Sequence, residues 1–354
     1  MADPYVLRAL LPSQQAEWDA FVTARPEGEG HFLQSWGWGE LKTGANWQPL
    51  RLALCSRDDG RIVAAAQVLR RTALHLPPRL GHLAYLPKGP VLDWTANTPD
   101  GIPLAHLFLH KVRDYLRGQG ALALQVEPPM AEDTPAAKLA LETLRDLGFQ
   151  PAQPVQPLRT IALDIRPSEE ELLARMKEKW RYNVRLSARK GVEVREAHEL
   201  AELRAWYELL ETTGERDQFG IHTFEYYRKF WEIFVPRGQA RLLLAYAENE
   251  LLAGIFVAHL AHEAIYLYGA SSNARRNLMP NYLLQWEAIR WTREAGANSY
   301  DFWGIPATDK PDEAMAGVYR FKSGWGGRAI TFPGNYQYSY HPGALRLVSR
   351  LLGR

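Results

Sequence analysis

The chain has 354 residues, more than one hydrophobic core usually holds, so we expect two domains. Hydrophobic residues make up 46% of the chain and charged residues 23%, which excludes a disordered protein. A formal net charge of +2 provides no global field for a polyanionic partner, so any phosphate or nucleic-acid site has to be a local patch. The single cysteine, Cys55, excludes internal disulfides and a cysteine-rich zinc cluster.

No segment of the sequence predicts export or membrane insertion. The N-terminus lacks the basic and apolar regions of a signal peptide, and no apolar run reaches the length of a membrane span. We therefore expect a cytoplasmic protein. Residues 344–354 predict an amphipathic helix with leucine and valine on one face and arginine beside them. Such a helix can rest on the inner face of an anionic membrane, or it can dock on the protein's own surface, as most amphipathic helices do.

Two parts of the chain show the same order of predicted elements. Apolar runs at 50–55 and 62–69 flank an Asp59-Gly60 step, a combination that strongly predicts a β-hairpin. A second hairpin is predicted from the apolar runs at 241–247 and 251–260. Each hairpin is followed by a third strand, a helix and a further strand, at 81–87, 104–116 and 122–126 in the first half and at 264–269, 282–289 and 299–303 in the second.

This order of elements resembles an N-acyltransferase half-domain, and here it occurs twice. We therefore predict an α+β fold with two tandem GNAT-like domains; two unrelated α+β domains of similar outline are the alternative. Three prolines within residues 151–157 are typical of a linker. The predicted first domain is 1–152, and the second is 153–330.

The second half begins with a predicted helix, 168–190, that is strongly basic. Ser168 and Glu171 form the signature of a capping box, and Gly191 ends the helix. The apolar edge recurs every four residues at Leu172, Met176, Trp180, Val184 and Ala188. A basic stripe recurs beside it at Lys177, Arg181, Arg185 and Arg189. Like charges at this spacing repel one another, so the stripe indicates a phosphate-bearing partner such as a nucleic-acid backbone. A solvated face whose ionic partners lie elsewhere in the fold is the alternative.

Several short strings resemble, in the same order, the FemABX family of peptidyltransferases, which add amino acids from aminoacyl-tRNA to peptidoglycan precursors. No single string is specific, but the ordered set is. The strings are Phe32-Leu33-Gln34-Ser35-Trp36, Lys88-Gly89-Pro90-Val91-Leu92-Asp93, Lys179-Trp180-Arg181-Tyr182-Asn183, Thr213-Gly214-Glu215-Arg216-Asp217, Tyr268-Gly269-Ala270-Ser271, Asn277-Leu278-Met279-Pro280-Asn281-Tyr282 and Tyr319-Arg320-Phe321-Lys322-Ser323-Gly324-Trp325-Gly326.

The resemblance implies a site for the precursor. Lys42 and Arg216 would help to hold its phosphates, with Asp93 and a tyrosine, Tyr266 or Tyr268, nearby. The precursor would be a muropeptide linked to UDP or to a lipid. Residues just after Arg216 depart from the family's pattern.

The resemblance also implies where the reaction occurs. Phe321 and Lys322 match the family's catalytic pair, in which the lysine steadies the reacting ester. Residues 331–354 would return to the first domain. Some members carry a long helical arm in the second domain, and because this chain has no such heptad run we expect the compact form, acting as a monomer.

The chemistry implied by these residues needs no added cofactor. An aminoacyl ester is already activated, so we expect neither a metal nor a redox group. The acceptor amine is the harder partner, since presenting it neutral at pH 7 costs about 4–5 kcal/mol. A cation such as Lys322 would lower the pKa of that amine and stabilise the oxyanion of the tetrahedral intermediate.

We therefore hypothesise transfer of an amino acid from aminoacyl-tRNA to a stem-peptide side-chain amine of a peptidoglycan precursor. The alternative is an acyl-CoA-dependent N-acyltransferase. Such an enzyme uses a glycine-rich turn to hold pyrophosphate, but residues 275–280 contain no glycine and include a proline. A third hypothesis is a non-catalytic nucleic-acid-binding module, but it explains neither Lys322 nor the duplication.

Overall fold

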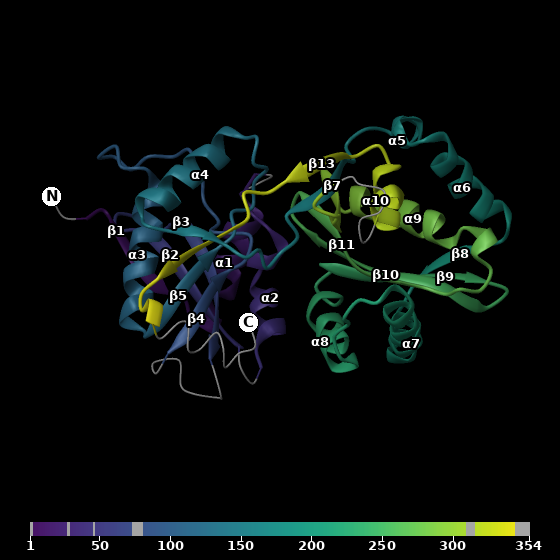
Figure 1. Cartoon of the computed structure of the whole chain (residues 1–354), viewed down its shortest axis with the longest axis horizontal. Helices are drawn as coiled ribbons and strands as arrows, with labels where there is room; N and C mark the ends of the chain where they lie inside the picture. The colour runs from purple at the N-terminus through teal and green to yellow at the C-terminus, as the bar shows by residue number, and fades with distance from the viewer. Residues whose placement is uncertain (1–2, 27–28, 45–46, 73–80, 309–315, 344–354) are drawn as a thin grey trace. The chain divides into compact units, whose positions relative to one another are not determined.

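The computed structural model describes residues 3–26, 29–44, 47–72, 81–308 and 316–343 (Figure 1). The chain forms two compact units. Unit 1 consists of Met1–Leu158 and Thr331–Arg354, and unit 2 consists of Arg159–Ile330. The amphipathic tail predicted at 344–354 lies outside the described residues. Within those ranges, no helix combines the length and the apolar character that crossing a bilayer requires.

Unit 1 is a mixed sheet covered by helices on both faces. Its strands lie in the order β1-β2-β3-β4-β5-β14-β6. The elements are β1 Tyr5–Ala9, α1 Gln15–Thr23, α2 Trp36–Lys42, β2 Trp47–Ser56, β3 Ile62–Thr72, β4 His82–Leu86, α3 Leu104–Gly118, β5 Ala121–Val126, α4 Pro135–Asp146, β6 Gln150–Ala152 and β14 Asn335–Ser339. The main core lies between the sheet and helices α3 and α4, while α1 and α2 pack on the other face.

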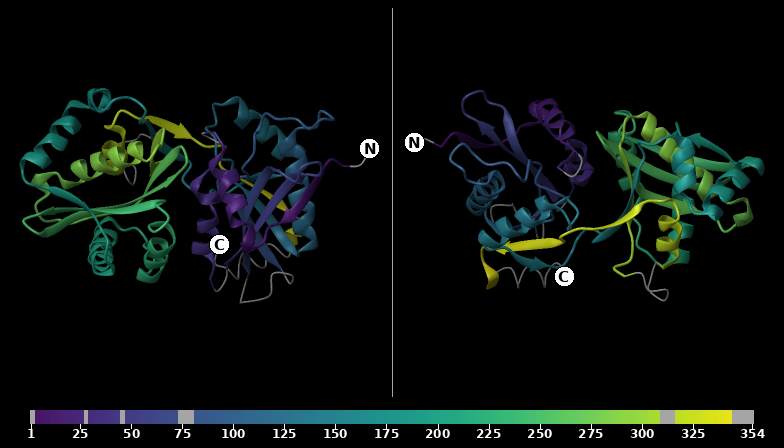
Figure 2. Two further views of the ribbon diagram at one scale, coloured as in Figure 1. Left: turned by 180° about the vertical axis from the view of Figure 1, so that it is seen from behind. Right: turned by 90° about the horizontal axis from the view of Figure 1, so that it is seen from above.

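Unit 2 repeats this architecture. Its strands lie in the order β13-β7-β12-β11-β10-β9-β8. The elements are β7 Arg159–Asp164, α5 Glu169–Arg175, α6 Glu178–Arg189, β8 Glu193–Glu196, α7 Leu200–Asp217, α8 Phe224–Phe234, β9 Ala240–Ala247, β10 Glu250–Leu260, β11 Glu263–Ser271, α9 Pro280–Glu294, β12 Ser299–Gly304, α10 Ala316–Ser323 and β13 Arg328–Thr331. Helices α7 and α8 cover one face of this sheet, and α5, α6, α9 and α10 cover the other (Figures 1 and 2).

The predicted hairpins are confirmed in both units. Strands β2 and β3 pair antiparallel, as do β9 and β10. Glu248 and Asn249 form the second turn with φ of 50° and 65°, the left-handed values that a tight hairpin turn requires. The predicted third strand, helix and further strand follow each hairpin, and the last two strands of each set, β4–β5 and β11–β12, pair in parallel.

Comparison of the two strand orders shows that the units exchange one strand. In unit 1, β14 from the C-terminal segment lies between β5 and β6. The corresponding position in unit 2, between β12 and β13, is held by β7, which follows β6 in sequence. In each unit, the inserted strand therefore belongs to the chain segment that directly follows the other unit in sequence. The yellow strand β14 can be followed into the sheet of unit 1 in Figures 1 and 2.

This exchange places the boundary between the units later than the prolines suggested. The break falls between Leu158 and Arg159 and not after residue 152. The residues in between stay with unit 1 because the amides of Val155 and Gln156 both donate to the buried carboxylate of Glu127.

The prediction of one continuous helix over residues 168–190 is wrong, because the helix is interrupted at Met176 and Lys177. Both residues have extended backbone, and α5 and α6 lie on either side of them. The break lets the amide of Lys177 donate to the carbonyl of Gly324, 2.9 Å away. Arg181 stabilises the end of α5 by donating to the carbonyls of Leu173 and Ala174. The predicted capping box at Ser168 is present.

The apolar edge of α6 also differs from its prediction at one position. Trp180 and Val184 are buried as expected, but Ala188 is exposed and Ser187 is buried in its place. A strict four-residue repeat drifts around a helix with 3.6 residues per turn, so two turns after Trp180 the core faces Ser187.

The packing of α6 on the segment after α10 predicts a specific stability effect. A Cβ on Gly324 would lie 2.1 Å from the indole of Trp180, whereas one on Gly317, in α10, would meet nothing within 4 Å. We expect Gly324→Ala to reduce the free energy of unfolding by about 1–3 kcal/mol through overpacking. Gly317→Ala should leave it unchanged or raise it by up to about 1 kcal/mol. Urea unfolding measures both, and equal losses in the two variants would contradict this account.

Candidate functional site

The two units differ in how far their parallel strands stay paired. In unit 1, β4 and β5 remain paired up to Leu86 and Val126. In unit 2, pairing of β11 with β12 ends at Ile265 and Asp301, although β11 continues to Ser271. The strands of unit 2 therefore separate part-way along β11, and several of the predicted site residues lie around this point.

A bulge in β11 separates the two tyrosines that were predicted as alternatives. Phe256 of β10 pairs with Tyr268, but Val257 pairs with Tyr266, so Leu267 is an extra residue in β11. Tyr266 packs against the core on the side of α9. The hydroxyl of Tyr268 contacts that of Tyr226 in α8, 3.1 Å away, on the opposite face.

Only Tyr266 of this pair lies beside the predicted catalytic lysine. The ammonium nitrogen of Lys322 is 5.6 Å from the centroid of the Tyr266 ring. A Cβ on Gly269 would lie 2.0 Å from the Tyr266 hydroxyl, so the glycine leaves the space that this hydroxyl occupies. Burial raises the pKa of Tyr266 to about 12, so its hydroxyl stays protonated at neutral pH.

Lys322 is buried and held by backbone carbonyls at the end of β12. Only 7% of the residue is exposed. Its Nζ donates to the carbonyl of Gly304 at 2.8 Å and to that of Trp303 at 3.2 Å. Burial lowers the pKa of Lys322 to about 8, and the charge of Asp301 opposes this shift. An ammonium group has three N–H donors, so one of them has no acceptor among the described residues.

The carbonyls that hold Lys322 depend on an irregular end of β12. Trp303 has a φ of 60°, which a bulky residue rarely adopts. Its amide donates to the carboxylate of Asp301 at 2.6 Å, and the hydroxyl of Thr160 in β7 donates to the same oxygen. Asp301 is 3% exposed. Its carboxylate fixes, through these two hydrogen bonds, the turn that presents the two carbonyls to Lys322.

Phe321 takes part in packing and in a backbone contact. Its ring packs against Tyr282 and Trp325, with centroids 5.4 and 6.0 Å away. Its carbonyl accepts a hydrogen bond from the indole N–H of Trp180 in α6, at 2.8 Å. Phe321 thus anchors α10, the helix that carries Lys322, to α6 and α9.

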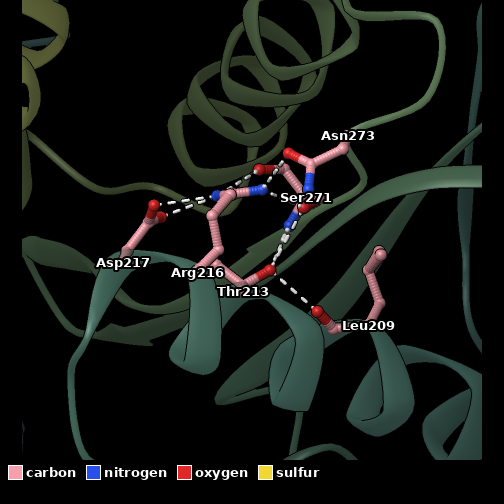
Figure 3. A network of polar contacts seen from close by, with 6 residues as sticks. All are labelled: Leu209, Thr213, Arg216, Asp217, Ser271 and Asn273. Carbon is pink, nitrogen blue, oxygen red and sulfur yellow. Dashed lines mark hydrogen bonds and ion pairs between the residues drawn. The ribbon is translucent and has the colours of Figure 1, made fainter.

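Arg216 lies at the end of α7 in a polar network that joins this helix to β11 (Figure 3). Its guanidinium donates to both carboxylate oxygens of Asp217, at 2.8 and 2.7 Å. It also donates to the carbonyl and hydroxyl oxygens of Ser271 and to the side-chain oxygen of Asn273. Thr213 adds a further link to Ser271. Every N–H of Arg216 therefore has an acceptor in the chain, and its predicted role in holding phosphates stays a prediction.

Lys42 and Asp93, the predicted acceptor residues of unit 1, lie in different surroundings. Lys42 is in the last turn of α2, with its Nζ 4.7 Å from the centroid of the Trp38 ring. Burial lowers the pKa of Lys42 to about 8. The carboxylate of Asp93 accepts from the amide and hydroxyl of Thr95, and these hydrogen bonds lower its pKa and keep it ionised.

The four cations predicted to bind phosphate differ in their local contacts. Lys177 is in the break before α6, and Arg181 caps α5. Arg185 and Arg189 are exposed on the outer face of α6. Within the described part of the chain none of the four forms an ion pair, so the alternative of partners elsewhere in the fold receives no support.

Sequence reasoning did not identify Asp301, Thr160 or Trp180 as parts of the site. Asp301 carried a usable signal, because it is a charged residue in the middle of an otherwise apolar strand run, and such a residue requires buried partners. No comparable signal marks Thr160. Trp180 was predicted as part of the apolar edge of its helix, but its contact with Phe321 depends on which segments meet in the fold. Among the described residues, no group of three or more His, Cys, Asp or Glu side chains is arranged to hold a metal.

Two amides of the turn between β11 and α9 already have acceptors within the turn. The amides of Leu278 and Met279 already donate to the carbonyls of Arg275 and Arg276. Pro280 has no N–H, and the side chain of Arg275 pairs with Glu248 and Glu250. This geometry weighs against a pyrophosphate held by the backbone of this turn.

Known proteins resemble this chain along nearly all of its length. The sequence model of the FemAB family matches residues 13–250 and 246–350. The lipid II:glycine glycyltransferase of Staphylococcus saprophyticus is 26% identical, over 94% of this chain and 93% of that protein. The enzyme of the same name from Staphylococcus aureus is 25% identical, over 96% of this chain and 94% of that protein.

Solved structures confirm the predicted fold of two GNAT-like domains. A crystal structure of FemX aligns with a TM-score of 0.84 at 24% identity, over 97% of this chain and 99% of that one. A tandem GNAT protein from the clavulanic acid biosynthesis pathway aligns with a TM-score of 0.57 at 14% identity, over 95% of this chain and 98% of that one. The longest helix among the described residues is α7, with 18 residues.

The surroundings of Lys322 predict how its pKa responds to substitution. We expect Asp301→Asn to lower the pKa of Lys322 further below about 8, because the charge that favours the ammonium form is lost while the amide oxygen can still accept from Trp303. NMR titration of the Lys322 Nζ measures this pKa. Asp164→Asn, on the neighbouring strand β7 and paired with Arg166, is the matched control and should leave it unchanged. An unchanged or raised pKa in Asp301→Asn would show that Asp301 does not act on Lys322.

Proposed function

This chain belongs to the FemAB family, and we propose that it transfers an amino acid from aminoacyl-tRNA to a side-chain amine in the stem peptide of a peptidoglycan precursor. It is an aminoacyltransferase that forms an amide bond. The observation that carries the proposal is the buried ammonium of Lys322, which two carbonyls hold with one N–H left over.

The geometry around Lys322 suits acyl transfer from an ester. The neutral acceptor amine attacks the ester carbonyl carbon, and the carbonyl oxygen becomes an oxyanion. The remaining N–H of Lys322 can donate to this oxyanion, and in a buried site such a donor is worth far more than in water. When the carbon–oxygen bond to the ribose breaks, the departing oxygen takes up the proton that the amine loses, and an amide remains. Lys322 therefore acts as a fixed cation and is not consumed.

The proposed acceptor is a lipid-linked muropeptide. The curated relatives are named as enzymes that act on lipid II, and they align with this chain over nearly their whole length. Lys42, Asp93 and Arg216 would contact this substrate. The amine is the nucleophile, so it must reach the site unprotonated, and the nearby charge of Lys322 favours that form.

The proposed donor is a charged tRNA, whose backbone would contact α6. The cations of this helix lack carboxylate partners among the described residues, so their charge is available to a phosphate backbone. Transfer from acyl-CoA is the weaker alternative, because the turn before α9 contains no glycine, two of its amides are already hydrogen-bonded within it, and Pro280 has no N–H.

A transfer assay tests the proposal directly. Purified protein receives lipid-linked precursor together with charged tRNA or with acyl-CoA, and mass spectrometry follows the precursor. We expect a mass gain of one or more amino-acid residues with charged tRNA and none with acyl-CoA. A gain with acyl-CoA alone, or none with any charged tRNA, would reject the proposal.

The role of Lys322 predicts a kinetic signature in this assay. We expect Lys322→Ala to lower kcat by about 10²–10³-fold with little change in KM, as for loss of one oxyanion donor. The wild-type rate should rise with pH as the acceptor amine loses its proton, and it should level off above about 8, where Lys322 loses its charge. Lys138→Ala, an exposed lysine on α4, should behave as wild type. A raised KM with unchanged kcat would make Lys322 a binding residue.

The network around Arg216 predicts a competition between Asp217 and the precursor. If Arg216 holds phosphate, Asp217 occupies the same two donors, since carboxylate and phosphate both bind a guanidinium through paired hydrogen bonds. Asp217→Asn should then lower the KM for the precursor, and Arg216→Gln should raise it. Asp164→Asn removes a similar paired contact to Arg166 and serves as the control. A raised KM in Asp217→Asn would assign the pair a purely structural role.

A further inference from the structure

The outer face of α6 carries an exposed aromatic ring among cations. Tyr182 is 54% exposed, whereas the other large aromatic side chains of unit 2, apart from Phe219, are buried or half-buried. Lys179, Arg185 and Arg189 lie three residues before it and three and seven residues after it, so they share its side of the helix. All three are exposed, and the guanidinium of Arg189 lies 6.0 Å from the centroid of the Tyr182 ring.

These three cations lack the carboxylate partners that several arginines of the same unit have. Ion pairs with carboxylates are formed on the other elements by Arg166, Arg195, Arg228, Arg275 and Arg290. Among the residues that the structure describes, Lys179, Arg185 and Arg189 form no such pair. The positive charge on this face is therefore available to an external anion.

The opposite face of α6 fixes the helix in place. Trp180 and Val184 are buried in the core of unit 2. The ring of Trp180 packs edge-on against Tyr282, and its indole N–H donates to the carbonyl of Phe321. The exposed ring of Tyr182 is thus carried by a helix that the core holds in place. It lies two residues from Trp180, whose hydrogen bond anchors the helix that carries Lys322.

We propose that Tyr182 is a stacking platform for an unpaired RNA base, and that Lys179, Arg185 and Arg189 hold the phosphates on either side of it. The inference rests on the proposed function and names a contact with the donor: a single-stranded segment such as the unpaired end of a tRNA. A ring with a free face flanked by unpaired cations is the combination that binds single-stranded nucleic acid, because every base offers a π-face and every linkage a negative charge.

Binding of single-stranded RNA to the full chain tests the platform. The probe is a fluorescently labelled 12-nucleotide RNA, and fluorescence anisotropy measures its Kd at several salt concentrations. We expect Tyr182→Ala to weaken binding about 5- to 150-fold, the range of a lost base–aromatic stack. Tyr182→Phe should bind as wild type, because stacking does not need the hydroxyl. The salt dependence should be unchanged in both variants.

Substitution of one of the cations should instead change the salt dependence of RNA binding. Arg185→Gln should reduce the slope of log Kd against log salt by about 0.7, the value of one phosphate contact on a single strand. An RNA with abasic sites should bind the wild type and Tyr182→Ala equally. Equal affinity of wild type and Tyr182→Ala for intact RNA would overturn the proposal, as would equal loss in Tyr182→Phe. Binding to anionic phospholipid vesicles that depends on Tyr182, with no binding to RNA, would instead identify a membrane contact.

Failure of this inference can be distinguished from failure of the proposed function. Uncharged RNA is the probe, so binding is measured without transfer. If Tyr182→Ala weakens RNA binding but no charged tRNA supports transfer, the platform stands and the proposed function fails. If transfer occurs and Tyr182→Ala leaves the KM for charged tRNA unchanged, the proposed function stands and the platform fails.

Discussion

The pairing of β7 with β12 is the contact on which the candidate site depends. Strand β7 enters unit 2 beside β12, and Thr160 donates to Asp301 across this pair. The regular ladder ends there, because the register shifts between Asp301 and Gly304. The chain turns at Trp303 with positive φ and presents two successive carbonyls to Lys322. A buried ammonium needs acceptors in place of water, and this irregular end of β12 supplies them.

Unit 1 has the same arrangement of strands, but its parallel strands do not separate. Its parallel strands stay paired to their ends, and the amide of Glu127 continues the contact by donating to Leu86. The carboxylate of Glu127 accepts from the hydroxyl of Tyr85 and from the amides of Val155 and Gln156. In unit 1, the chain's own groups therefore surround the carboxylate that follows β5. Two copies of one plan thus differ in whether their parallel strands separate.

The sequence predicted the regular elements because they follow from local patterns. Alternation, turn residues and helical periodicity identified both hairpins and the helix and strand after each. The break between α5 and α6 could not be predicted in this way, since its cause is the hydrogen bond from Lys177 to Gly324, far along the chain. The choice between Tyr266 and Tyr268 was also beyond local patterns, because one extra residue in β11 places them on opposite faces. The family resemblance named Lys322, but only the fold shows what holds it.

Helix α6 connects the two chemical features of unit 2. Its inner side carries Trp180, whose N–H donates to the backbone of Phe321 next to the lysine. Its outer side carries Tyr182 and the unpaired cations. An α-helix with side chains is about 10–12 Å across, so this one element would set the spacing between the proposed RNA contact and the ammonium of Lys322. A continuous helix from 168 to 190 would have lacked the extended turn at Lys177 and its hydrogen bond to Gly324. The break that the periodic pattern missed therefore adds, beside the Trp180 contact, a second link between the proposed RNA contact and the segment that carries the lysine.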